Sequence, residues 1–226
     1  MAEKEPRIKI LKDGPYMLTG DTCMSVKIIR PSGNSYEWED GGEIAHRDPS
    51  ILCRCGASDK PPFCDGSHKK IKFDGTETAS RDLYKNRAVC INGAEVDMLD
   101  DNRCALARFC HREKGDAWEL AADGGDDNRC ETISAASECP SGRLTAVTKD
   151  GKVIEPELCK SIEIIQDPEM DVSGGIYVKG GIRLESADGY EYEARNRVVL
   201  CRCGKSKDKP FCDGSHIDEK FKDTCK

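Results

Sequence analysis

The sequence predicts an α+β protein that is mostly β, made of two similar β-rich repeats and a small α+β unit between them. Three observations support this prediction. The stretch CRCGASDKPPFCDGSH at residues 53–68 returns almost unchanged as CRCGKSKDKPFCDGSH at residues 201–216. Short alternating runs bounded by glycine precede both copies, as is typical of strands. Between the copies the repeat disappears, so a different unit is expected there.

The similarity of the two halves extends beyond the quoted stretches. GPYMLTG at residues 14–20 has a counterpart in GIYVKGG at residues 175–181, and a short apolar run precedes the first cysteine of each copy. Each half is therefore expected to contain a few strands, a metal-binding loop and one short helical turn. We expect three domains: residues 1–83 and 161–226 as the repeats, and residues 84–160 as the insert.

The insert contains predictable elements of its own. Residues 132–138 are expected to form a short helix that ends before Pro140, because proline cannot continue a helix. Residues 144–148 and 152–154 are expected to form a hairpin whose turn uses Gly151. Pro156, Pro168 and the Gly174–Gly175 pair predict a linker back to the second repeat.

Composition indicates that burial alone gives limited stability. Hydrophobic residues make up 37% of the 226 residues and charged residues 34%, but the chain has fourteen cysteines. The start, MAEKEPRIKI, lacks the apolar run of a signal peptide, so we expect a cytoplasmic protein. In that compartment clustered cysteines more often bind metal than form disulfides.

The net charge of −7 argues against nucleic acid as a partner. Much of the excess lies between Glu95 and Glu131, where eleven acidic residues face five basic ones. Such a run is either a solvated face or a docking surface for a basic partner.

The repeated stretch supplies metal ligands at regular spacing. Two cysteines flank one residue, and Gly56 permits the sharp turn that brings them together. A cysteine and a histidine follow four residues apart, which places them on one face of a helical turn. The candidate ligands are Cys53, Cys55, Cys64 and His68 in the first copy, and Cys201, Cys203, Cys212 and His216 in the second.

Three thiolates and one imidazole suit either tetrahedral zinc or the irons of an iron–sulfur cluster. Zinc sites usually present two knuckles with two residues between their cysteines, and CxC followed by CxxxH departs from that spacing. The spacing therefore favours a cluster, while a structural or regulatory zinc module remains the alternative.

The spacing CxCxxSxxxPxCDGSH resembles the CDGSH iron–sulfur family, the mitoNEET-like proteins, at every motif position in both copies. The resemblance implies a [2Fe–2S] cluster in each loop. It assigns Cys53 and Cys55 to one iron, and Cys64 and His68 to the other. Small members of the family dimerise with their clusters side by side beneath a shared β-cap. A chain with both copies is therefore expected to form that pair internally, as a pseudo-twofold unit, and to be a monomer or a homodimer.

A histidine ligand couples the redox state of a cluster to protonation. Imidazole is neutral and titrates near pH 6.5, unlike a thiolate with its fixed charge. Replacing thiolate by imidazole also raises the reduction potential. Protonation of His68 or His216 would remove an iron ligand, so acid is expected to loosen the cluster.

The insert carries a weaker cysteine pattern. NRCALARFC and ECPSGRL match the first, third and fourth ligands of a single-cluster ferredoxin, with Ala107 at the second. Residues 100–147 resemble the divergent mono-cluster ferredoxin-like domain that accompanies CDGSH repeats. The implied site is a [3Fe–4S] cluster, or a [4Fe–4S] cluster completed by His111, Cys130, Cys90 or an outside ligand; the alternative is a fold without a cluster. The tentative ligands are Cys104, Cys110 and Cys139.

The other cysteines show no spacing typical of a site. We expect them to pack in apolar interiors, or to be free thiols near the C-terminus. They are Cys23, Cys90, Cys130, Cys159 and Cys225.

No catalytic triad, phosphate-binding glycine loop or dinucleotide motif is present, so we expect no enzyme. The leading hypothesis is a soluble multi-cluster protein that carries electrons or transfers clusters to a redox or Fe–S acceptor protein. The alternatives are the zinc module and an electron-transfer subunit of a redox enzyme. No membrane partner is expected, because no segment is long and apolar enough.

Overall fold

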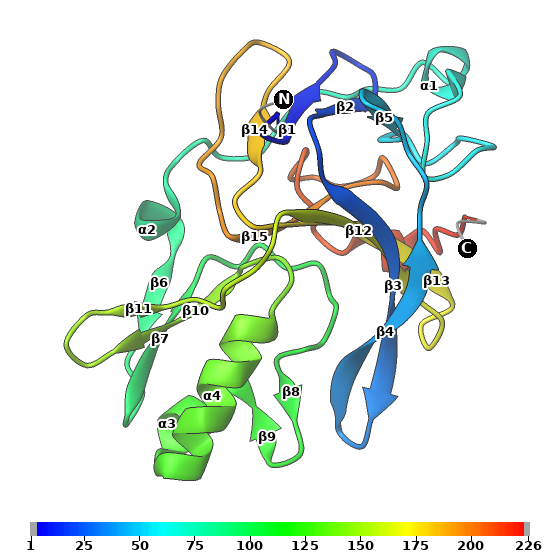
Figure 1. Cartoon of the computed structure of the whole chain (residues 1–226). Coiled ribbons are helices and arrows are strands. Elements are labelled where there is room, and N and C mark those ends of the chain that lie inside the picture. Colours follow the sequence, from blue (N-terminus) through cyan, green and yellow to red (C-terminus); the bar gives the residue numbers. More distant parts are fainter. Residues whose placement is uncertain (1–3, 224–226) are drawn as a thin grey trace.

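The computed structural model of the chain describes residues 4–223 and confirms an α+β architecture that is mostly β (Figure 1). Two β-rich regions that contain the repeated motifs flank a separate middle region. No helix within the described residues is long and apolar enough to cross a membrane. The first repeat contains β1 (Arg7–Ile10), β2 (Tyr16–Thr19), β3 (Cys23–Ser32), β4 (Ser35–Glu43), β5 (Ser50–Leu52) and α1 (Ser67–Lys70).

The second repeat follows a similar order of elements but has one strand fewer. It contains β12 (Ser161–Asp167), β13 (Val172–Lys179), β14 (Arg183–Glu185), β15 (Arg197–Leu200) and α5 (Ser215–Asp218).

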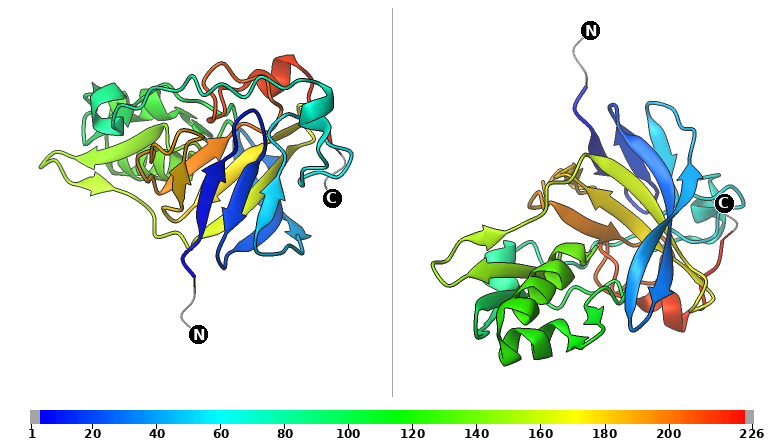
Figure 2. Two further views of the ribbon diagram at one scale, coloured as in Figure 1. Left: turned by 90° about the horizontal axis from the view of Figure 1, so that it is seen from above. Right: turned by 60° about the horizontal axis from the view of Figure 1, so that its bottom comes forward.

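The two repeats exchange strands. One sheet has the order β14-β1-β2-β5 and the other the order β15-β13-β12-β3-β4. Within each, the third strand of one repeat pairs in parallel with the first strand of the other: β14 with β1, and β3 with β12. Figure 2 shows the blue strands of the first repeat beside the yellow and orange strands of the second. The exchange forms a pseudo-twofold unit within one chain.

A single hydrophobic core joins the repeats. Fully buried side chains from the first repeat, such as Leu18 and Leu52, belong to the same cluster as Ile176 and Leu200 of the second. Neither repeat buries these surfaces by itself, because each sheet contains strands of both. Residues 4–83 and 161–223 are therefore two segments of one packed body.

The segment from Pro156 to Gly175, predicted as a linker, is largely β-sheet. It contains β12 and the start of β13, and Gly174 and Gly175 lie inside β13. A Cβ atom on Gly174 would lie 2.7 Å from the Ile165 side chain, and one on Gly175 would lie 2.5 Å from that of Val199. The glycines allow close packing there, so the prediction of a linker was wrong.

The middle unit packs helices against a sheet of its own. The predicted hairpin is present as β10 (Leu144–Thr148) and β11 (Val153–Ile154), in the sheet order β11-β10-β7-β6. The predicted helix is longer than expected, since α4 spans Asp126–Glu138, and its polar first half shows no apolar periodicity. The remaining elements are α2 (Tyr84–Arg87), β6 (Val89–Ile91), β7 (Val96–Asp100), β8 (His111–Arg112), β9 (Gly115–Asp116) and α3 (Ala117–Asp123).

The middle unit is attached to both repeats. The long β3–β4 hairpin extends beside it, where the Trp38 ring stacks on Phe109 with centroids 4.4 Å apart (Figure 1). From the second repeat, the buried Arg197 donates a 2.8 Å hydrogen bond to the carbonyl oxygen of Ala136 and forms a 3.0 Å ion pair with Glu155. These contacts hold the insert against the β-sheets.

Glycines let the two metal-binding loops contact each other. A Cβ on Gly56 would lie 2.4 Å from the carbonyl oxygen of Cys203, and one on Gly204 would lie 2.6 Å from that of Cys55. Both glycines also have positive φ, 74° and 78°. The loops of the two repeats therefore meet backbone to backbone across the pseudo-twofold axis.

The substitution Gly56→Ala is expected to lower the free energy of unfolding by more than the positive φ at residue 56 alone would cause. Gly151→Ala is the matched control, because Gly151 has φ 85° and nothing within 4 Å of an added Cβ. Urea denaturation is expected to show a loss of about 1 kcal/mol for the control and of about 3 kcal/mol or more for Gly56→Ala. Equal losses would show that the loop contact contributes nothing.

Candidate metal centres

The structure brings the predicted ligands of each repeat together as two pairs. The Cys53 and Cys55 sulfurs lie 3.7 Å apart, and the Cys64 sulfur lies 3.3 Å from Nδ1 of His68. The second repeat has the same arrangement, with 3.7 Å between the Cys201 and Cys203 sulfurs and 3.4 Å between the Cys212 sulfur and Nδ1 of His216.

Backbone hydrogen bonds fix the first loop around its ligands. The Cys53 N–H donates to the carbonyl of Pro62, and the Cys64 N–H donates to that of Ile51, both at 2.8 Å. The second loop repeats these bonds, Cys201 to Pro210 and Cys212 to Val199, also at 2.8 Å. The short strand before each first cysteine thus holds the returning segment that carries the third cysteine of the motif.

A carboxylate organises the turn between the last cysteine and the histidine. Asp65 accepts hydrogen bonds of 2.9 Å from the N–H groups of Asp59 and Ser67. These donors hold the pKa of Asp65 well below its usual range. Gly66 precedes α1 with φ 91° and is the N-cap residue. Asp213 has the same role in the second repeat, with donors Lys207 and Ser215.

Hydrogen bonds favour the thiolate form of the first cysteine in each copy. The neighbouring Cys55 thiol is the main cause of the lowered pKa of Cys53, about 6, and backbone N–H groups of the turn add to it. The Cys203 thiol likewise lowers the pKa of Cys201 to about 7. The same hydrogen bonds, together with burial, raise the pKa of Cys55 and Cys203. Metal binding requires thiolates, so in each thiol pair it is the first cysteine that these donors favour as a ligand.

The arginine between the first two cysteines was not singled out in the sequence. Arg54 is only 1% exposed, and its Nε donates a 2.8 Å hydrogen bond to the carbonyl of Gly14. Arg202 is equally buried, donates from Nε to Gly174 at 3.1 Å, and forms an ion pair with Asp223. The repeated CRCG could have predicted this role. An arginine between two metal ligands is drawn inside the loop, and a buried charge needs hydrogen-bond partners within the protein.

The histidine sides of the two sites differ in burial. His216 is 4% exposed, and burial lowers its pKa to about 4. Cys212 is also buried, whereas Cys64 and His68 are partly exposed. The two sites therefore have the same ligands but differ in how far their histidine sides are buried.

Each repeated site contains one thiol pair and one thiol–imidazole pair, and this division shows whether the ligands fit the implied [2Fe–2S] cluster. No group of three or more His, Cys, Asp or Glu side chains in residues 4–223 is arranged to hold a metal ion. A tetrahedral zinc site requires three or four such ligands around one point. In a [2Fe–2S] centre the sulfides bridge two irons, so each iron needs only two protein ligands. Two thiols on one side, and a thiol with an imidazole on the other, fit this requirement.

The three tentative ligands of the middle unit surround one small cavity of about 20 Å³. Burial is the main cause of the raised pKa of Cys110, about 11, and the nearby Cys139 and Cys104 add to it. These three thiols are the donors that a cluster held by three thiolates would use, although within the described residues they do not form a ready-made group around one metal ion. Ala107, at the missing second position, also lines the cavity and offers no ligand atom.

The fourth ligand proposed for this site is not among the residues that line the cavity. His111, Cys130 and Cys90 are exposed and lie outside its lining. The expected apolar packing of the other cysteines was also wrong, since Cys23 and Cys159 are exposed as well. Cys225 lies outside the described residues.

An ion pair supports the loop that carries Cys104. Asp100 binds Arg143 through two hydrogen bonds of 2.6 and 2.8 Å and accepts a 3.2 Å hydrogen bond from the Trp118 indole. Hydrogen bonding to Arg143 is the main interaction that holds the pKa of Asp100 below its usual value, against the opposing effect of burial. Arg143 also lies over the Trp118 ring, 5.2 Å from its centroid.

The substitution Asp100→Asn is expected to destabilise the chain at neutral pH, and less so in acid. A lowered folded-state pKa contributes stability above the unfolded value of about 3.9, and this is lost as pH falls through the folded value. The difference in unfolding free energy between parent and variant should thus shrink as pH falls below about 4. Denaturation of both proteins at a series of pH values measures it, and a difference independent of pH would contradict the role of the charge.

Comparison with known proteins supports this geometry. The family described as iron-binding zinc finger, CDGSH type, matches residues 13–69 and 173–217, which include all eight ligands of the repeated sites. No curated protein and no solved structure matches the chain. The two matches coincide with the two loops whose ligand pairs and backbone hydrogen bonds agree. Both repeats of this chain therefore match the model of the CDGSH-type iron-binding family.

Proposed function

We propose that the chain is an iron–sulfur protein that carries electrons with coupled protons, or transfers clusters, through two [2Fe–2S] centres. The observation that carries the proposal is the division of each ligand set into a thiol pair and a thiol–imidazole pair. Such a division suits two irons and leaves a single zinc ion with too few ligands. A bound cluster supplies one-electron chemistry, which no side chain provides.

The chain's own residues would bind and shield the clusters. The cysteines and histidines bind, and backbone N–H groups such as those of Gly56 and Gly66 donate to the sulfurs. The buried Arg54 and Arg202 stabilise the loops. Because the loops touch at the pseudo-twofold axis, the proposal includes passage of electrons between the two centres inside one molecule.

The proposal includes a third cluster, of three or four irons, bound by Cys104, Cys110 and Cys139. The shared cavity supports it. We also propose that the chain is a carrier in the reducing cytoplasm rather than an enzyme, and that it acts as a monomer with an internal pair of sites, or as a homodimer. A zinc module and an electron-transfer subunit of a redox enzyme remain the competing functions.

Iron and sulfide analysis of anaerobically purified protein tests the proposal directly. We expect four irons and four sulfides from the two repeated sites, plus three or four irons and four sulfides if the middle site is filled. The triple variant Cys104→Ser/Cys110→Ser/Cys139→Ser should lose only the additional iron, and any electron paramagnetic resonance signal of that cluster. Colourless protein that contains zinc would overturn the proposal.

Replacement of a histidine ligand by cysteine is expected to lower the reduction potential of its site. A thiolate adds negative charge to the centre, which disfavours the reduced state, and it removes the titrating group. Redox titration of His68→Cys and His216→Cys at several pH values should therefore give lower midpoints with weaker pH dependence. Midpoints and slopes equal to those of the parent would contradict the assigned role of the histidines.

A further inference from the structure

The two repeated sites have the same internal bonds but different neighbours. Cys212 and His216 of the second site are 2% and 4% exposed, while Cys64 and His68 of the first are partly open to solvent. The motif cannot cause this difference, because its residues are the same in both copies. The cause must lie in what packs against each site.

The middle unit covers the histidine side of the second site. A Cβ on Gly214 would lie 2.4 Å from Cδ1 of Leu106, which belongs to the loop of the three-cysteine site. The Arg103 guanidinium lies 3.9 Å from the centre of the Phe211 ring and forms a 2.7 Å ion pair with Asp208. This side of the second site is therefore already occupied by the chain itself.

The same side of the first site has no such cover among the described residues. A Cβ on Gly66, the counterpart of Gly214, would have nothing within 4 Å. The middle unit does not cover the four residues that follow His68 in the sequence, and all four are exposed: Lys69, Lys70, Ile71 and Lys72. Ile71, the apolar residue among them, is 52% exposed. We call these four residues the lysine face.

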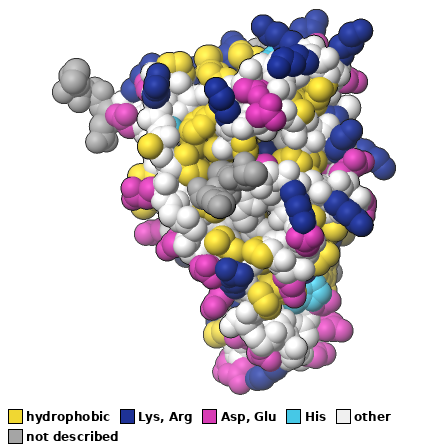
Figure 3. All heavy atoms as spheres, turned by 90° about the vertical axis from the view of Figure 1, so that its right-hand side faces the viewer, with side chains coloured by type: hydrophobic (Ala, Val, Ile, Leu, Met, Phe, Trp, Pro, Cys, Tyr) yellow, Lys and Arg dark blue, Asp and Glu magenta, His cyan; other side chains and the backbone are white. Residues whose placement is uncertain are grey.

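The lysines of the lysine face and of the adjoining groove form no direct ion pairs within the described residues. None of its three lysines forms an ion pair with any residue in the described range 4–223, and the same holds for Lys205 and Lys209 in the adjoining groove. The groove has a volume of about 460 Å³ and lies between the two loops. Figure 3 shows basic side chains gathered along the top of this side of the molecule, where α1 lies in Figure 1.

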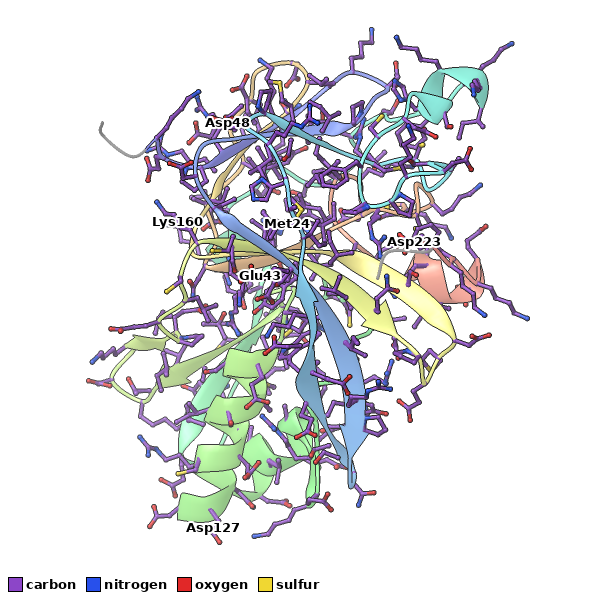
Figure 4. All side chains as sticks on the ribbon, turned by 45° about the vertical axis from the view of Figure 1, so that its right-hand side comes forward. Met24, Glu43, Asp48, Asp127, Lys160 and Asp223 are labelled. Carbon is purple, nitrogen blue, oxygen red and sulfur yellow. The ribbon has the colours of Figure 1, made fainter. Side chains whose placement is uncertain are left out.

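The acidic groups near the lysine face are largely engaged by neighbouring polar groups. Asp65 accepts hydrogen bonds from two backbone N–H groups, and Asp74 accepts two from Thr76. Asp74 and Glu219 also line the groove beside Lys72, Lys205 and Lys209, and their carboxylates keep their negative charge. The acidic stretch from Glu95 to Glu131 belongs to the middle unit, and Asp127 lies at the opposite end of the molecule from α1 (Figure 4). The molecule thus has a basic end and an acidic end.

We propose that the lysine face is the docking surface for an acidic redox protein, which reaches the first site through the exposed side of Cys64 and His68. The inference rests on the proposed function and adds a place and a class of partner to it. The second site is then internal, because the three-cysteine loop occupies the equivalent surface. Opposite charge attracts the partner and orients it.

The size of the face favours a protein over a phosphate polymer or a membrane. Three lysines around one exposed isoleucine suit the small, weak interfaces of electron-transfer complexes. Nucleic-acid binding typically neutralises six to ten phosphates, and the net charge of −7 opposes an extended anionic surface.

Binding of an acidic plant-type [2Fe–2S] ferredoxin to the iron-loaded full-length chain tests this proposal. Isothermal titration calorimetry at low ionic strength is expected to show binding that weakens with added salt. The variant Lys69→Glu/Lys70→Glu/Lys72→Glu should bind about tenfold more weakly or worse. The control Lys85→Glu/Lys114→Glu/Lys152→Glu changes three exposed lysines of the middle unit by the same total charge and should bind within about twofold of the parent. Iron content, measured for each protein, should be unchanged.

Hydrogen exchange in the complex locates the contact. Backbone amides of residues 64–72 should gain protection when ferredoxin binds, and those of residues 212–220 should not. Equal weakening in both triple variants, or protection at the second site, would overturn the docking surface. Binding to anionic vesicles in place of ferredoxin, lost in the same lysine variant, would also overturn it. An iron-loaded chain with no such binding refutes only this inference, whereas an iron-free chain refutes the proposed function.

Discussion

The contact of Gly56 with the carbonyl of Cys203, and of Gly204 with the carbonyl of Cys55, is the constraint on which the arrangement of the sites depends. Any side chain at these positions would push the two loops apart. Since the loops continue directly from β5 and β15, their separation is tied to the sheets that the repeats share. Exchange of β3 and β14 between those sheets holds the two halves in register. Sheet exchange and loop contact together make one body of two similar sequences.

The middle unit makes the surfaces of the two repeated sites unequal, although the sites themselves are similar. A pair of identical sites offers a partner two equivalent surfaces. Here the loop of the three-cysteine site lies against the second site through Leu106, and the matching position at Gly66 is open. The ion pair of Arg103 with Asp208, and that of Arg108 with Asp167, join this loop to the second repeat. Asymmetry therefore arises from the position of the insert, because the motifs themselves are alike.

Two kinds of polar group support the candidate centres. Backbone N–H groups surround the sulfurs and stabilise negative charge on them, and the glycines make that approach possible. Buried arginines lie behind the loops and donate to backbone carbonyls, as Arg54 does to Gly14 in the β1–β2 turn and Arg202 does to Gly174 in β13. An arginine is suited to this task because its planar group donates several hydrogen bonds from one position. The loops are thus held in place by the protein, with little apolar material.

The sequence alone determined the mostly β class, the eight candidate ligands and their grouping into two similar loops, because these follow from local spacing and from repetition. It also located the β10–β11 hairpin, whose turn residues act locally. The tertiary structure decided what depends on distant residues: the exchange of strands, the strand character of the segment around Gly174 and Gly175, and the partners of Arg54 and Arg202. It also decided that Cys212 is buried while Cys64 is partly exposed, since burial of one motif and not the other is set by where the insert packs.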